Sequence, residues 1–126
     1  MNTILTLIIL TIVLIGLDYT YMTINKSMFV DQIIKIQNTT IIGKPIGFIL
    51  CYLFIILGLY YFIIKNHKTP LDAFLLGLFV YGVFELTNYS LLKNWSLKVV
   101  VIDTLWGGIL FFITTFLFYK IEKWIR

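Results

Sequence analysis

The chain has 126 residues, of which 60% are hydrophobic and 13% charged, whereas soluble domains carry about 45–50% apolar and about 25% charged residues. This composition, with apolar runs too long for strands of a soluble sheet, excludes a water-soluble enzyme and leaves no room for a second sizeable domain. The net charge is +4, but the basic residues lie between and after the apolar runs, as in membrane-flanking loops. We therefore expect no nucleic acid partner.

Four apolar stretches reach the length of about 20 residues that a helix needs to cross a membrane. Thr69 and Ser96 precede the third and fourth stretches as N-caps, and Pro45 opens the second. The sequence predicts an all-α, multi-pass integral membrane protein, with residues 1–126 forming a single transmembrane four-helix bundle. The expected spans are residues 3–23, 46–64, 70–92 and 97–119.

The segment between the first two spans is less apolar and carries polar residues at helical spacing. Ser27, Asp31, Lys35 and Asn38 recur among apolar neighbours. This pattern predicts a short amphipathic helix over residues 27–38 that lies on the membrane surface, with Asp31 and Lys35 as an i,i+4 ion pair. An irregular, isoleucine-rich loop is the alternative.

Three acidic residues, Asp18, Glu85 and Asp103, lie within the expected spans. Because successive spans alternate in direction, the three acids face the same side of the membrane, at one depth roughly 8–10 Å below its surface. A carboxylate at the centre of a membrane helix costs about 2.5–3.5 kcal/mol on insertion scales. Intramembrane acids mark ion or substrate routes by default, so these residues indicate a functional site.

Polar and aromatic residues share helix faces with these acids. Facing inward together, they would form a polar pocket open toward the loop side of the bundle. The expected pocket or ion-binding residues are Asp18, Glu85, Asp103, Asn88, Tyr81, Tyr21 and Trp106.

A purely structural role for the acids is the alternative. In that case Asp103 would pair with the Trp106 indole or a tyrosine, and Glu85 would pair with Asn88 or Lys98. Buried acids then serve only as interhelical hydrogen-bonding groups. Close helix packing is expected in any case at Thr104 and Gly108, which form a small-xxx-small pair.

The first and fourth spans repeat one short pattern, an Asp followed after two residues by an aromatic. Asp18-x-x-Tyr21 and Asp103-x-x-Trp106 are called here the two Asp-x-x-aromatic motifs. The repetition hints at an internal pseudo-symmetry, as in small transport proteins. A chance echo is the alternative.

Longer motifs surround these residues: Leu17-Asp18-x-x-Tyr21 followed by Met28-Phe29, Tyr81-x-x-x-Glu85-Leu86-Thr87-Asn88, and Trp95 ahead of Ile102-Asp103-x-x-Trp106-Gly107. In them, over nearly the whole chain, the sequence resembles domain-of-unknown-function family 2177 of predicted bacterial membrane proteins. The family usually has Trp at the position of Tyr21 and Asp at that of Glu85, so both are departures that keep the chemical type. The resemblance implies four spans and these site residues, but no activity.

Acids without a catalytic nucleophile favour a small transport protein or ion pathway for a proton, cation or cationic solute. We expect a homo-oligomer, because four spans alone enclose little. A structural or accessory subunit of a membrane assembly or viral envelope is one alternative.

A membrane-embedded lipid-modifying enzyme is the other alternative. His67, the sole histidine, is expected in a loop on the opposite side, which counts against this reading and makes a non-enzyme the stronger expectation. We expect no cofactor. The three acids and Asn88 offer oxygen ligands for Mg²⁺ or Ca²⁺, but no spacing demands a metal.

Overall fold

A computed structural model of the chain describes residues 1–39 and 43–126. Within these ranges every regular element is helical, which confirms the all-α prediction. The elements are α1 (Thr3–Ile24), α2 (Lys26–Gln37), α3 (Pro45–Leu59), the π-helical turn η1 (Tyr60–Ile64), α4 (Pro70–Leu91) and α5 (Leu97–Ile125).

In the described part of the chain, four helical segments are long and apolar enough to cross a membrane: α1, α3 with η1, α4 and α5. The prediction of a multi-pass integral membrane protein is confirmed. The helix ends lie close to the expected span ends, except that α5 continues past residue 119 to Ile125. No Gly or Pro interrupts this extension, and an ion pair of 3.6 Å between Glu122 and Arg126 supports its last turn.

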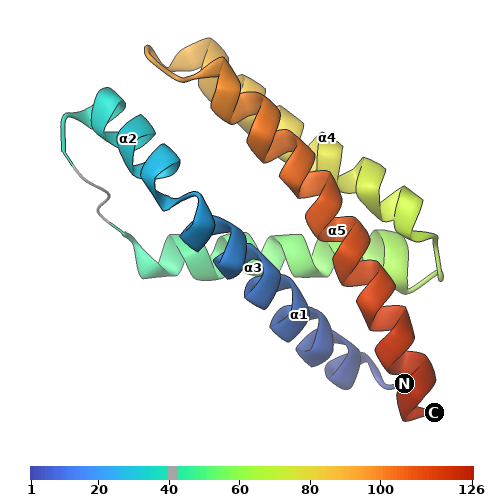
Figure 1. Ribbon diagram of the computed structural model, residues 1–126. Coiled ribbons are helices and arrows are strands. Elements are labelled where there is room, and N and C mark those ends of the chain that lie inside the picture. The colour runs from blue at the N-terminus through green and yellow to red at the C-terminus, as the bar shows by residue number, and fades with distance from the viewer. Residues whose placement is uncertain (40–42) are drawn as a thin grey trace.

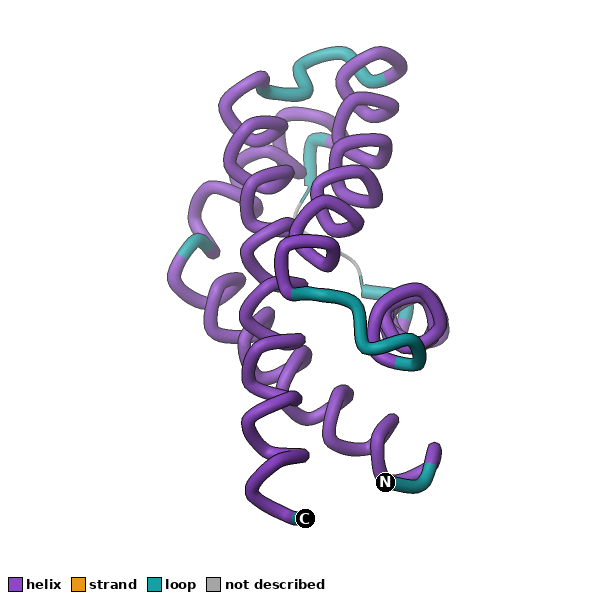
Figure 2. Tube along the Cα trace, turned by 90° about the vertical axis from the view of Figure 1, so that its right-hand side faces the viewer, coloured by secondary structure: helices purple, strands orange, loops and turns teal. Residues whose placement is uncertain are grey.

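The chain alternates between the two ends of the molecule. Figures 1 and 2 show the N- and C-termini together at one end, and the connection between α4 and α5 at the other. Helix α2 also lies toward that other end in Figure 1. We call it the α2 end and the opposite one the terminal end. Consequently α1 and α5 run antiparallel.

Helix α2 occupies the place where the amphipathic helix is predicted, and Asp31 and Lys35 lie on its exposed face. The ion pair expected between these two residues is wrong, because the structure does not join them. An exposed i,i+4 pair gains only about 0.2–0.5 kcal/mol, too little to hold two solvated side chains together.

Helices α4 and α5 are the closest pair, because glycines allow their backbones to approach each other. A Cβ atom at Gly77 would collide with the backbone carbonyl of Gly107, and one at Gly107 would collide with the Tyr81 side chain. A Cβ atom at Gly82 would lie 3.4 Å from the Thr104 methyl group. The expected close packing around Thr104 and Gly108 is therefore present, with α4 as the partner helix.

The apolar core lies between the spans and extends toward the terminal end. Its buried members include Leu10, Leu14, Ile56, Leu59, Leu110, Phe111 and Phe118. Most other large apolar side chains of the spans are exposed on the outside of the bundle, where the bilayer surrounds them.

Capping and one tyrosine hold the connection between η1 and α4. The Thr69 hydroxyl accepts a hydrogen bond from the backbone N–H of Asp72 at 3.1 Å, and the Asp72 carboxylate accepts one from the Thr69 N–H. This capping box confirms Thr69 as an N-cap. Tyr119 of α5 donates its hydroxyl to the Lys68 carbonyl at 2.6 Å, and its ring stacks on exposed His67. His67 thus lies before the start of α4 and beside the last part of α5, at the helix ends opposite to those near Glu85 and Asp103.

Candidate functional site

The two Asp-x-x-aromatic motifs pair with each other across α1 and α5. Trp106 donates its indole N–H to Asp18 at 2.8 Å, and Tyr21 donates its hydroxyl to Asp103 at 3.1 Å. The two helices are antiparallel, so the two motifs run in opposite directions. The Asp of each motif therefore lies beside the aromatic residue of the other motif. The sequence repetition therefore has a structural counterpart: a reciprocal pair of hydrogen bonds.

The aromatic members of the two motifs lie against each other. The Tyr21 and Trp106 rings are stacked, with centroids 4.4 Å apart and an interplanar angle of 3°. Phe29 of α2 lies edge-on to Tyr21, with centroids 5.8 Å apart. Such aromatic pairs contribute about 0.5–1.5 kcal/mol beyond the area that they bury. The stack fixes the two donor groups relative to the two acids.

A third helix joins at Asp18. Tyr52 of α3 donates its hydroxyl to the second carboxylate oxygen of Asp18 at 2.5 Å. Asp18 is only 7% exposed, and its two oxygens accept from α3 and from α5. The Asp18 carboxylate therefore connects three of the four spans.

Glu85 and Asp103 form the other half of the cluster, between α4 and α5. Glu85 is 2% exposed and accepts the Trp95 indole N–H at 3.1 Å. Its carboxyl group also lies within hydrogen-bonding reach of the Asp103 carboxyl group. The Glu85–Asp103 pair thus brings the acids of α4 and α5 together.

The acids share one level along their helices. Asp18 lies six residues before Ile24, Glu85 six before Leu91, and Asp103 six after Leu97. At a rise of about 1.5 Å per residue, each lies about 9 Å from the α2 end of its helix.

Helix α2 covers this end through one buried glutamine. Gln32, which is 3% exposed, donates to the Asn94 carbonyl and accepts from the Ser96 N–H, both at 2.7 Å. The connection between α4 and α5 is thus bonded to α2 on both sides of Trp95. Gln32 thereby positions the indole that binds Glu85.

Two predicted site residues lie at the margin of the cluster. Tyr81 is partly buried and packs against Gly107, which lies four residues after Asp103 on α5. Asn88 is half-buried one turn beyond Glu85, and its side chain forms no hydrogen bond with any described residue. The structure brings together Asp18, Tyr21, Glu85, Asp103 and Trp106, with Tyr81 beside them.

Of the two pairings expected for a structural role, the one for Asp103 is confirmed and the one for Glu85 is wrong. Trp106 donates to Asp18 across the helix interface and not to Asp103 on its own helix. Glu85 binds Trp95 rather than Asn88 or Lys98. Lys98 is exposed in the first turn of α5, where water solvates its ammonium group better than the bundle interior does. The tyrosine alternative for Asp103 is confirmed by Tyr21.

Sequence reasoning missed Tyr52 and Gln32, and it named Trp95 as part of a motif without predicting its bond to Glu85. Gln32 lies four residues after Met28 and four before Ile36, so it interrupts the apolar stripe of α2. A polar residue in such a stripe signals a buried hydrogen-bonding role. Tyr52 carries a hydroxyl in an otherwise apolar span, a weaker signal, because tyrosine is also common at membrane interfaces.

Three buried hydroxyls on α5 complete the polar interior. The side-chain oxygens of Thr104, Thr114 and Thr115 are buried and bond no group in residues 1–39 and 43–126. Thr114 and Thr115 are 0% exposed. Thr114 lies 11 residues after Asp103, about three helical turns further on the same face and about 16 Å closer to the terminal end.

The acids have no cationic partner in the described chain, where the one ion pair joins Glu122 to Arg126. The same residues contain no group of three His, Cys, Asp or Glu side chains placed to hold a metal ion. The Glu85–Asp103 pair and Asp18 are thus carboxyl groups satisfied by neutral tyrosine and tryptophan donors.

Comparison with known proteins yields one match. The family described as "Predicted membrane protein (DUF2177)" matches residues 3–119, which include all three acids and their donors. No curated protein and no solved structure matches the chain. The chain, which has four spans around a hydrogen-bonded cluster of acids, therefore belongs to the DUF2177 family of predicted membrane proteins.

Proposed function

We propose that the protein binds a proton or a cation at the intramembrane acid cluster and moves it across the membrane. The observation that carries this proposal is the cluster itself: three carboxyl groups from three spans, bonded to neutral donors and, among the described residues, to no cationic side chain. A site with several acids and no internal counter-charge has the charge to hold a proton or an external cation.

The cost of the acids favours a role beyond helix packing. At Glu85 and Asp103 a single oxygen accepts the Trp95 or Tyr21 donor, so Gln or Asn there would preserve the hydrogen bond with a smaller desolvation cost. A carboxyl group differs from an amide in being able to release a proton or carry a charge. That difference is the property a transport site needs.

The unpartnered threonine hydroxyls support a route toward the terminal end. A buried hydroxyl without a hydrogen bond costs about 1–3 kcal/mol, and a water molecule entering beside it would remove that cost. Thr114 continues the face of α5 that bears Asp103, below the acids and inside the apolar core. Waters at these hydroxyls would link the acids to the far side.

The route requires more than one copy of the chain, because four spans enclose only the core described above. We propose a homo-oligomer whose subunits contact one another through the exposed apolar faces. Chemical cross-linking in liposomes at rising protein-to-lipid ratio tests this part, and a protein that stays monomeric under these conditions would remove it.

Proton and cation flux into proteoliposomes tests the proposal. We expect Asp18→Asn, Glu85→Gln and Asp103→Asn each to abolish flux that the wild type supports, while circular dichroism shows that the variants remain folded. Thr114→Val keeps the side-chain shape without the hydroxyl and should reduce flux. Thr20→Val is the matched control, because Thr20 is exposed and bonds its own helix at Gly16. Flux that persists in all three acid variants would contradict the proposal.

A structural subunit is the second candidate, favoured by one observation: every acid already has a hydrogen-bond donor or a carboxyl partner. In this case the wild type shows no flux, and the acid variants lose folding rather than transport. Purification from native membranes with a stoichiometric partner chain would then support this candidate.

A further inference from the structure

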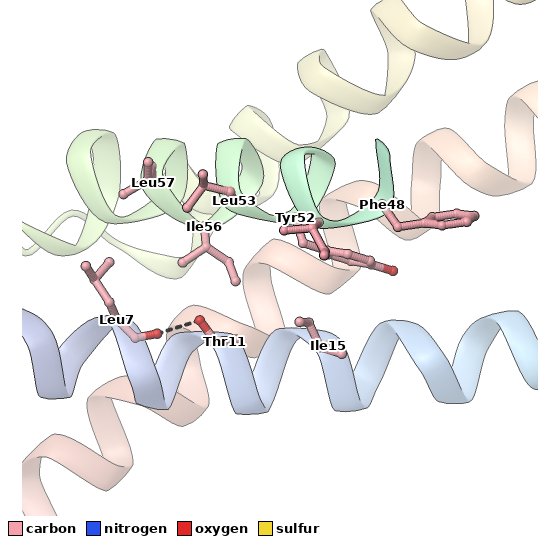
Figure 3. Close-up of a pocket in the computed structure, with 9 residues that line it drawn as sticks. Leu7, Thr11, Ile15, Phe48, Tyr52, Leu53, Ile56 and Leu57 are labelled. Carbon is pink, nitrogen blue, oxygen red and sulfur yellow. Dashed lines mark hydrogen bonds between the residues drawn. The ribbon is translucent and has the colours of Figure 1, made fainter. Parts of the chain in front are cut away.

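An apolar groove runs between α1 and α3, on the outside of the two spans. Its volume is about 380 Å³, and its walls are Leu7, Thr11, Ile15, Phe48, Ile49, Tyr52, Leu53, Ile56 and Leu57. In Figure 3, Leu7, Thr11 and Ile15 point from α1 toward α3, while Tyr52 and Ile56 point back toward α1. The Thr11 hydroxyl donates to the Leu7 carbonyl of its own helix, so this threonine offers the groove its methyl group.

Only hydrocarbon fills such a groove in a membrane. The lining belongs to two candidate spans, and no water is available in the bilayer core to occupy an open apolar surface there. The volume lies at the low end of small-molecule pockets, about 300–1,000 Å³. It therefore has room for one alkyl chain rather than for the two chains of a membrane phospholipid.

One end of the groove lies next to the acid cluster, to which Tyr52 connects it. Tyr52 is both a wall of the groove and the donor to Asp18. Leu7, Thr11, Ile15 and Asp18 are spaced by four, four and three residues, so the face of α1 that lines the groove leads directly to the carboxylate.

The groove also has the direction that an amphiphile takes in a bilayer leaflet. Asp18 is about 9 Å from the α2 end of α1, and Leu7 lies about 16 Å further along the helix toward the terminal end. A bound molecule with its head at Asp18 and its chain along Ile15, Thr11 and Leu7 thus has its head toward the membrane surface and its chain toward the interior.

We propose that the α1–α3 groove binds the alkyl chain of a single-chain amphiphile whose ammonium head is bound at Asp18 and Tyr52. The head is cationic because Asp18 has no cationic partner in the described residues, and an ammonium group donates to carboxylate and phenol oxygens alike. This inference rests on the proposed function, since it names the class of cation that the acid cluster accepts.

Photo-labelling tests the proposal on the whole protein in phosphatidylcholine liposomes. The probes are a dodecylammonium and a dodecanol that carry the same photoreactive group on the chain. We expect the ammonium probe to label peptides from both groove walls, with an affinity about tenfold higher than that of the neutral alcohol. Unlabelled dodecylammonium should compete. Equal labelling by the two probes, or labelling outside the groove alone, would overturn the proposal.

Two variants locate the site. Ile15→Trp fills the groove and should abolish labelling by both probes, whereas Ile12→Trp makes the same change at a position that is 69% exposed and outside the groove, and should leave it intact. Tyr52→Phe keeps the apolar wall and removes the hydroxyl, so it should reduce the preference for ammonium. A preference that Ile15→Trp leaves unchanged would contradict the proposed place of binding.

The same variants separate this inference from the proposed function. Ile15→Trp fills a groove beside the acids without altering any of them, so small-cation flux should persist while amphiphile labelling is lost. Flux without ammonium-selective labelling would overturn the groove inference alone. Ammonium-selective labelling in a protein that moves neither protons nor cations would overturn transport and leave the binding site standing.

Discussion

The pair α4–α5 and the pair α1–α3 are built in opposite ways. Glycines bring α4 and α5 so close that a single methyl group at Gly77 has no space. Between α1 and α3 a groove of about 380 Å³ stays open, and the polar bond across it is Tyr52 to Asp18. Backbone contact makes the first pair one stiff unit, whereas the second pair is joined by apolar side chains and one hydroxyl. The acids lie where these two pairs meet.

The largest effect is expected from removing the close approach of α4 and α5. Gly77→Ala should lower the free energy of unfolding by about 3 kcal/mol or more, because the added Cβ meets the rigid backbone of Gly107. Denaturant titration in mixed micelles measures this change. Gly58→Ala is the control in α3, since a Cβ there meets nothing within 4 Å. Similar losses for both variants would mean that the two pairs do not differ in this way.

The next largest effect on stability is expected at Gln32, through which α2 covers the connection between α4 and α5. Gln32→Ala removes two hydrogen bonds of 2.7 Å to the connection between α4 and α5, so we expect a loss of about 2 kcal/mol. Hydrogen exchange at residues 92–96 should accelerate, and Trp95 fluorescence should shift toward that of a more exposed indole. Asp31→Ala on the exposed face of α2 should change stability by less than about 0.5 kcal/mol. An unchanged exchange rate at residues 92–96 would refute the positioning role of Gln32.

A smaller effect on stability is expected for the pair α1–α3. Tyr52→Phe deletes the hydroxyl that bonds Asp18 and should cost about 1 kcal/mol, the usual range for an interhelical hydrogen bond in a membrane. Exchange should quicken in α3 and remain slow in α4, which tests whether α3 separates independently. Tyr61→Phe, at an exposed tyrosine of η1, serves as the neutral comparison. Equal acceleration in α3 and α4 would show that the four spans open together.

The smallest effect is expected at the start of α4, where Thr69 caps the helix. Thr69→Ala should cost about 0.5 kcal/mol, because the site is exposed and water replaces part of the lost hydrogen bond. Thermal unfolding measures it against Thr20→Ala, which changes a helix-interior threonine. A loss of several kcal/mol at Thr69 would mean that this connection, rather than the glycine contact, controls the stability of α4.

The sequence of neighbouring residues by itself determined much of the structure. Apolar runs of about 20 residues specify helices across a membrane whatever their partners are, since a spanning segment must satisfy its own backbone. The spacing of Asp18, Glu85 and Asp103 from the span ends then sets their common level. The capping by Thr69 and the helical conformation of α2 follow from neighbouring residues in the same way.

The tertiary structure decided which hydrogen-bond partner each polar side chain has, because these partners depend on how the helices rotate and approach one another. The reciprocal bonds of Asp18 with Trp106 and of Tyr21 with Asp103 require antiparallel helices turned toward each other. Trp95 reaches Glu85 because α2 holds its connection. The groove exists because α3 meets α1 at Tyr52 without close backbone contact. Residue type and spacing determine which groups need a partner, while packing between distant segments determines which partner each receives.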